Sequence, residues 1–156
     1  MRKINPEYVR AVMALANSGS YFRLISMSIR ELGRGHCLME AEIDGQKHLQ
    51  AFGFVHGGVY ASLIDTAAFW AAICDLDEDV GITTVDLNVN YLAPIQEGKL
   101  VTRGKLIKLG RTLGLGEATV TTETGKLVAH GTSTLMLVPG LGFARGKDLP
   151  PKFMKP

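Results

Sequence analysis

The stretch that decides the fold covers residues 56–65 and reads HGGVYASLID. A His-Gly-Gly turn opens an almost wholly apolar segment, and this segment carries one carboxylate, that of Asp65. Glycines at a helix start leave backbone N–H groups approachable by an anionic or carbonyl oxygen. A carboxylate on an apolar helix is costly unless it has a partner or a role. The two features together indicate acyl chemistry, in which one group holds a carbonyl oxygen and another attacks the carbon or activates water.

The segments on either side of this stretch predict a helix followed by strands. The helix is expected to run to about Ile73 or Cys74, and its apolar character on nearly all sides predicts complete burial. From Gly81 onward apolar and polar residues alternate, as in a half-buried strand, until Ala93-Pro94 ends the pattern. Three more strands are expected over residues 99–109, 112–123 and 126–138, with connections short enough for antiparallel hairpins.

The remaining segments are expected to surround this core. Asn5 and Pro6 predict a capped helix that stops at residues 17–20. Residues 22–33 and 36–43 are predicted to be strands, and residues 44–55 a loop that leads to His56. The acidic run 75–79 is expected to be a solvated loop. Residues 139–156, rich in Pro, Gly and Lys, are expected to be a loose tail.

The predicted fold class is α+β, with a curved antiparallel β-sheet wrapped around one long central helix and an N-terminal helix as a cover. Strands near ten residues are long, which suits a sheet that wraps around a helix. Such a sheet leaves an edge and an apolar rim exposed, so two copies are expected to pair. We expect a single domain over residues 1–138 and a C-terminal tail over 139–156.

Composition limits the function classes. The 156 residues are 46% hydrophobic and 21% charged, which fits a soluble globular domain. The net charge is +2 without a dense Lys/Arg run, which argues against nucleic-acid binding. The two cysteines, Cys37 and Cys74, form no disulfide framework, and no signal peptide or membrane-spanning run is visible. A cytoplasmic location without membrane insertion is therefore expected.

At this point the residues resemble a known family. The element order resembles the hotdog fold, and the spacing from His-Gly-Gly to Leu-Ile-Asp resembles acyl-CoA thioesterases of the phenylacetic-acid-degradation (PaaI) type. The likeness extends over about residues 5–138 and includes VDLNVNYL at 85–92, Gly98, GRT at 110–112 and GKLVA at 125–129. It implies hydrolysis of a thioester to a free acid and coenzyme A, no cofactor besides the coenzyme A of the substrate, and a dimer or dimer of dimers.

The resemblance also implies roles for individual residues. Asp65 matches the family carboxylate, a nucleophile or general base, and Gly57 beside His56 matches the amide that polarises the thioester carbonyl. Thr84 falls near a position, often Ser or Thr, that helps to orient the attacking water. Where the family often has Asn ahead of the turn, the nearest match here is Gln50.

Helix geometry predicts how these groups meet. Gly57 and Gly58 offer N–H groups that stabilise negative charge on an oxygen, aided by the helix dipole. Asp65 lies eight residues beyond Gly57, roughly 12 Å along one helix. One carbonyl group cannot touch both groups of one chain. Two antiparallel helices side by side bring Gly57 of one chain next to Asp65 of the other, so we expect two shared active sites per dimer.

Substrate contacts are less specific. Tyr60, Phe69, Trp70 and Tyr91 are either the lining of an acyl pocket or plain core. We count Gly58, Tyr60 and Ser62 as substrate contacts; Ser62 lacks an identifiable His or Asp partner and the elbow of a nucleophilic serine. Three basic residues on or beside one hairpin either meet coenzyme A phosphates or form a solvated face: Lys105, Lys108 and Arg111.

Several alternatives stay open at the level of sequence. Asp65 is also compatible with the N-cap of a separate helix, and His56 with either a helix cap or an acid/base. A hotdog hydratase or dehydratase would want a His facing an acid across the site, whereas here the His directly precedes the glycines. A non-catalytic acyl-CoA-binding protein is the third reading.

Overall fold

The structure is a computed structural model that describes residues 2–143 and 148–155. Its helices are α1 (Pro6–Asn17), α2 (Ser20–Leu24) and α3 (Gly57–Ile73). The Asn5 side chain accepts a hydrogen bond from the Glu7 N–H at 3.0 Å, and Pro6 occupies the first turn, as the sequence predicts. The capped first helix and the long helix after the glycine turn are both confirmed.

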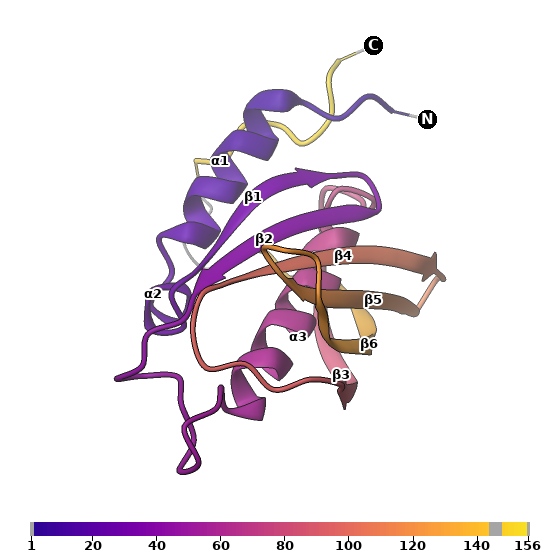
Figure 1. The fold of residues 1–156 in the computed structure, drawn as a ribbon. Helices are drawn as coiled ribbons and strands as arrows, with labels where there is room; N and C mark the ends of the chain where they lie inside the picture. The colour runs from indigo at the N-terminus through magenta and orange to yellow at the C-terminus, as the bar shows by residue number, and fades with distance from the viewer. Residues whose placement is uncertain (1, 144–147, 156) are drawn as a thin grey trace.

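One six-stranded antiparallel sheet holds the other elements together (Figure 1). Its spatial order is β1-β2-β4-β5-β6-β3, so β1 and β3 form its two edges. The strands are β1 (Met27–Gly33), β2 (His36–Glu42), β3 (Val80–Tyr91), β4 (Lys99–Leu109), β5 (Leu113–Thr122) and β6 (Leu127–Pro139). The predicted strands after residue 80 agree with these bounds to within about a residue.

The central helix α3 lies against the sheet, whose strands curve around it (Figure 1). Its buried side chains include Leu63, Ile64 and Ala67, each with no exposed surface. The sheet approaches α3 closely because it carries glycines at the contact: a Cβ on Gly104 would lie 2.2 Å from the Ala67 carbonyl oxygen. The predicted α+β hotdog architecture, with a curved antiparallel sheet, a central helix and an N-terminal helix, is therefore confirmed.

The C-terminal segment is not loose where the structure describes it, contrary to the expectation. Lys152 and Phe153 are buried, and residues 3–5 and 152–154 pair as two short extended segments. The Asn5 N–H donates to the Lys152 carbonyl, and the Met154 N–H donates to the Lys3 carbonyl, both at 2.9 Å. Backbone pairing and burial of the Phe153 ring hold this segment beside α1 (Figure 1).

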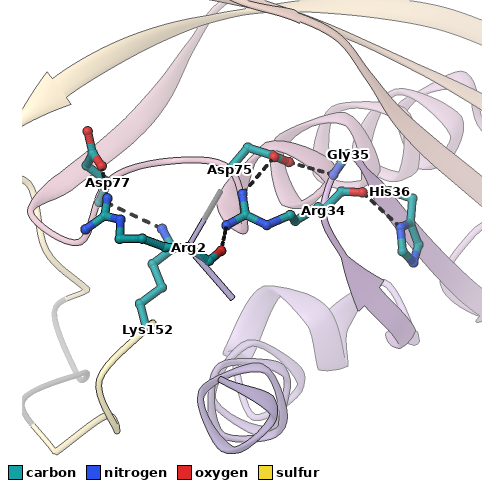
Figure 2. Close-up of polar contacts among 7 residues, drawn as sticks. All are labelled: Arg2, Arg34, Gly35, His36, Asp75, Asp77 and Lys152. Carbon is teal, nitrogen blue, oxygen red and sulfur yellow. Dashed lines mark hydrogen bonds and ion pairs between the residues drawn. The ribbon is translucent and has the colours of Figure 1, made fainter. Parts of the chain in front are cut away.

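One further expectation is wrong, and another holds only in part. Residues 20–24 form the short helix α2, so β1 begins at Met27 and not near residue 22. Residues 77–79 are exposed, as expected of a solvated loop, but Asp75 is not. Its carboxylate accepts hydrogen bonds from the Gly35 N–H at 2.6 Å and from Arg34 Nη1 at 3.2 Å (Figure 2). The charged Arg34 side chain of the β1–β2 turn offsets the free-energy cost of partly burying this carboxylate.

Candidate active site

The His-Gly-Gly turn places two glycine amides at the start of α3, but only one of them is free. His56 is the N-cap, and its ring Nδ1 accepts the Gly58 N–H at 2.8 Å. Gly58 is therefore not a bare amide, which corrects the expectation that both glycines hold an oxyanion. Within the described residues, the Gly57 N–H has no hydrogen-bond acceptor. The structure thus assigns His56 the capping role and leaves the Gly57 amide available to a ligand.

An open pocket of about 420 Å³ lies beside this amide. Its polar walls are Gln50, Gly57, Tyr60 and Tyr91, and its apolar walls come from residues 54–55 and 92–94. Tyr91, at the end of β3, lies so close that a Cβ on Gly57 would be 3.1 Å from its ring. The structure thus brings together three residues that the sequence proposed separately, Gln50, Gly57 and Tyr60.

Gln50 is positioned by a tight turn that precedes α3. Its N–H donates to the Phe54 carbonyl at 2.8 Å, and its carbonyl accepts the Gly53 N–H at 2.9 Å. Its side-chain Oε1 accepts the Phe52 N–H. The side-chain oxygen is thereby engaged, so the Nε2 amino group is the end of Gln50 that can donate to a substrate.

Asp65 lies two turns further along α3, on the side that faces β3 and β6. Its Oδ1 accepts hydrogen bonds from Thr84 Oγ1 at 2.7 Å and from Ser133 Oγ at 3.3 Å. Its Oδ2 has no partner among the residues that the structure describes. Because α3 is continuous from Gly57 to Ile73, Asp65 is not the N-cap of a separate helix. The geometry instead fixes one carboxylate oxygen and leaves the other for chemistry.

Ser133 is the residue at this carboxylate that the sequence analysis missed. It is fully buried on β6 and faces α3 among the inward residues of that strand, beside Leu135 and Gly131. A hydroxyl at an otherwise apolar inward position is the signal that marks it, because a buried hydroxyl requires a hydrogen-bond partner.

The other proposed site residues lie elsewhere. Ser62 Oγ donates to the Gly58 carbonyl at 2.8 Å and shares a 2.6 Å hydrogen bond with Tyr21, so its hydroxyl is engaged within the chain. Lys108 and Arg111 are exposed around the β4–β5 turn. Of the aromatic residues, Trp70 is buried and stacks on Phe143 at 5.9 Å between ring centroids.

Comparison with known proteins identifies the family of the chain. The sequence model of the thioesterase superfamily matches residues 52–129, a span that includes the free amide, Asp65 and Thr84. The chain belongs to the thioesterase superfamily. As a member of that superfamily the protein is a thioester hydrolase, and the resemblance drawn from its motifs is confirmed at this level.

Relatives of this thioesterase share most of its length. It is 30% identical to human acyl-coenzyme A thioesterase 13 over 130 residues, which cover 82% of this chain and 90% of the relative. It is 29% identical to the 1,4-dihydroxy-2-naphthoyl-CoA hydrolase of Listeria monocytogenes over 111 residues, 71% and 89% of the two chains.

Solved structures agree with the fold of this thioesterase. A thioesterase from Haemophilus influenzae superposes with a TM-score of 0.75 at 25% identity and covers 93% of this chain and 100% of that one. Across residues 2–143 and 148–155 of the present chain, no helix combines the length and the apolar character needed to cross a bilayer.

Proposed function

We propose that this thioesterase hydrolyses acyl-CoA esters to a free acid and coenzyme A, in sites that each join Gly57 of one protomer to Asp65 of its partner. One observation carries the proposal: a single chain presents a free amide and a half-free carboxylate on the same helix but eight residues apart. At 1.5 Å per residue this separation is about 12 Å, too far for one carbonyl group to contact both.

Coenzyme A as the leaving group is supported by the relatives. Human acyl-coenzyme A thioesterase 13 and the Listeria hydrolase both carry coenzyme A in the names of their activities. The His-Gly-Gly and Leu-Ile-Asp motifs support placement in the PaaI-like group of hotdog thioesterases. On this proposal the exposed Lys108 and Arg111 are available to the phosphates of the coenzyme.

The sheet supports pairing of two protomers. Strand β3 is twelve residues long and hydrogen bonds only to β6, so its other edge is unpaired within the described chain. An exposed edge of this length is a template for a second strand. A two-fold axis beside β3 would place two α3 helices antiparallel, which is the arrangement that brings Gly57 next to Asp65 of the partner subunit.

The proposed chemistry follows from the groups present. The Gly57 N–H, at the positive end of the α3 dipole, stabilises the negative charge that develops on the thioester oxygen. Asp65 either attacks the carbonyl carbon through Oδ2 or takes a proton from an attacking water. In the water route the new C–O bond forms, the C–S bond breaks, and the departing thiolate receives a proton. In the direct route the C–S bond breaks as Oδ2 bonds to the acyl carbon, and water then hydrolyses the resulting anhydride to the free acid and Asp65. Thr84 and Ser133 hold the carboxylate, Gln50 donates to substrate or water, and no cofactor is required.

The direct test is Asp65→Asn, with release of free thiol measured over a panel of acyl-CoA esters. Asn retains the shape of Asp and an acceptor oxygen for Thr84, so the fold is expected to survive. Loss of the base or nucleophile is expected to lower kcat by about 10²–10⁴-fold. Asp79→Asn, which changes an exposed carboxylate, is the matched control and is expected to retain wild-type activity. Wild-type turnover by the Asp65 variant, or an enoyl product without free thiol, would overturn the proposal.

A further inference from the structure

A second cavity, of about 410 Å³, lies at the other end of α3. It is bounded by the last turns of that helix, by the start of β3, and by residues 141–143 and 149–152 of the C-terminal segment. Its walls include Phe69, Ile73, Ile82, Phe143, Leu149 and Lys152. The volume falls within the usual range of small-molecule sites. Besides its apolar residues, the wall carries two charged residues, Glu78 and Lys152.

The cavity lies further along the helix and the strand that carry Asp65 and Thr84. Phe69 follows Asp65 by four residues, which places both side chains on one face of α3 about 6 Å apart along the axis. Ile82 precedes Thr84 by two residues, so both side chains lie on one face of β3. The same two surfaces that hold Asp65 therefore line the cavity one helical turn further on.

Lys152 is a buried cationic residue in the wall of this cavity. The residue is only 3% exposed, and burial lowers the pKa of its ammonium group to about 8. The nearest acceptor to Nζ is the Asp77 carbonyl oxygen at 3.5 Å, and among the described residues no carboxylate forms an ion pair with it. The nearby charges of Asp77 and Glu78 raise this pKa by less than burial lowers it, so a bound anion would offset more of the cost of the buried charge.

The carboxylates around Lys152 already have other partners. Asp77 pairs with Arg2, and Asp75 pairs with Arg34 and the Gly35 N–H, as Figure 2 shows. Glu78, which lines the cavity, accepts the backbone N–H of Lys152 at 2.9 Å. The backbone of this segment is thereby fixed. Among the described residues, the ammonium group has one weak acceptor, the Asp77 carbonyl oxygen, and lies 5.8 Å and 5.9 Å from the ring centroids of Tyr8 and Phe153.

We propose that the cavity receives the acyl group of the substrate and that Lys152 binds a carboxylate at its far end. The preferred substrates would then be thioesters of dicarboxylic acids, with an apolar middle against Phe69, Ile73 and Phe143. This inference rests on the proposed function, since it assumes that Asp65 acts on the thioester at the near end. Lys152 lies outside the segment that matches the superfamily, so this selectivity would come from the C-terminal segment of the chain.

The test compares two six-carbon substrates, adipyl-CoA and hexanoyl-CoA, which differ in a terminal carboxylate. We expect wild-type kcat/KM to favour adipyl-CoA by at least about tenfold, and Lys152→Met to lower the adipyl-to-hexanoyl ratio by about 10–100-fold. Lys155→Met is the matched control, because it removes an exposed lysine three residues away; it is expected to leave the ratio unchanged. Lys152→Arg, which keeps the charge, is expected to retain part of the preference.

The outcomes separate this inference from the proposed function. Equal or better turnover of hexanoyl-CoA by the wild type would overturn the role of Lys152 while the thioesterase proposal stands. An equal loss for both substrates in Lys152→Met would show a structural role and would also overturn it. If no acyl-CoA ester releases thiol, the proposed function fails. Calorimetric binding of adipyl-CoA to the Asp65→Asn variant, with and without Lys152→Met, still tests the anion site.

Discussion

The polar groups at the two ends of α3 differ in whether they have partners within the chain. At the first turn, His56 caps the Gly58 amide, but the Gly57 amide faces an open pocket without a partner in the described chain. Beyond the last turn, Asp75 accepts from both Arg34 and Gly35, and Asp77 pairs with Arg2 (Figure 2). The Asp75 and Asp77 carboxylates at the far end bind the N-terminal segment and the β1–β2 turn, whereas the Gly57 amide of the first turn is free to bind a ligand.

This difference shows how structural and chemical polar groups can be told apart in one helix. A buried or half-buried group whose hydrogen-bonding capacity is filled by the chain stabilises the fold. A group left with free capacity beside a pocket is available to a ligand, as are the Gly57 N–H and the Lys152 ammonium group. Asp65 Oδ2 likewise has no partner among the described residues. Substitutions of Gly57 and Lys152 change one such group at each end of α3.

At the first turn, Gly57→Pro removes the free N–H and is expected to give the larger effect. Proline is favoured at the first position of a helix, and the extended backbone of His56 (φ −64°, ψ 138°) is compatible with a following proline. Loss of one donor to a developing oxyanion typically lowers kcat by about 10²–10³-fold. Thiol release from an acyl-CoA substrate measures the effect.

Gly57→Ala is the control for this change. It introduces the same Cβ, 3.1 Å from the Tyr91 ring, but keeps the N–H. We expect a much smaller loss in the alanine variant than in the proline variant. Equal losses would mean that crowding of Tyr91, not removal of the donor, is what the substitution changes.

At the far end, Lys152→Met is expected to raise stability in a pH-dependent way. Burial lowers the pKa of Lys152 from 10.5 to about 8, so between these values the unfolded chain binds a proton that the folded chain has released. The buried charge therefore lowers the free energy of unfolding of the wild type by its full amount below about pH 8. This free energy rises again as the pH increases toward 10.5. The lowering of the pKa from 10.5 to about 8 corresponds to roughly 3 kcal/mol.

Urea denaturation at pH 7 and pH 10 measures this effect. The free energy of unfolding of the Met variant is expected to exceed that of the wild type by about 2 kcal/mol or more at pH 7 and by clearly less at pH 10. Lys155→Met, which removes an exposed ammonium group, is expected to match the wild type at both values. A stability difference that does not change with pH would show that Lys152 is not the buried cation described here.

The sequence predicted most of the fold because its patterns are local and strong. The all-round apolar helix after Gly57 and the alternating strands after Val80 follow directly from periodicity. Residues 20–24 were predicted wrongly because a five-residue helix offers too few residues for a period. The docking of Phe153 depends on pairing with residues near Ile4, and such long-range pairing leaves no local pattern.

The candidate site was only partly readable from the sequence. The family resemblance gave roles to Asp65 and Thr84, and the structure places Thr84 Oγ1 2.7 Å from Asp65 Oδ1, a contact that was not predicted. The sequence predicted a helix cap as one role of His56. The sequence did not predict that His56 Nδ1 would accept the Gly58 N–H, because the orientation of the ring depends on the side-chain rotamer. Nor did it predict the Tyr91 ring beside Gly57, which requires the end of β3 to meet the start of α3.

The central claim, that each site uses Gly57 of one protomer and Asp65 of the other, is tested most directly by mixing two inactive variants. Asp65→Asn and Gly57→Pro chains, each with a different affinity tag, are co-expressed, and dimers that carry both tags are purified. In such a dimer one site has an intact amide and an intact carboxylate, and the other has neither. The account predicts about half of the wild-type activity per dimer, from one working site of two. No recovery above the parent variants would show that Gly57 and Asp65 of the same chain serve one site and would contradict the account.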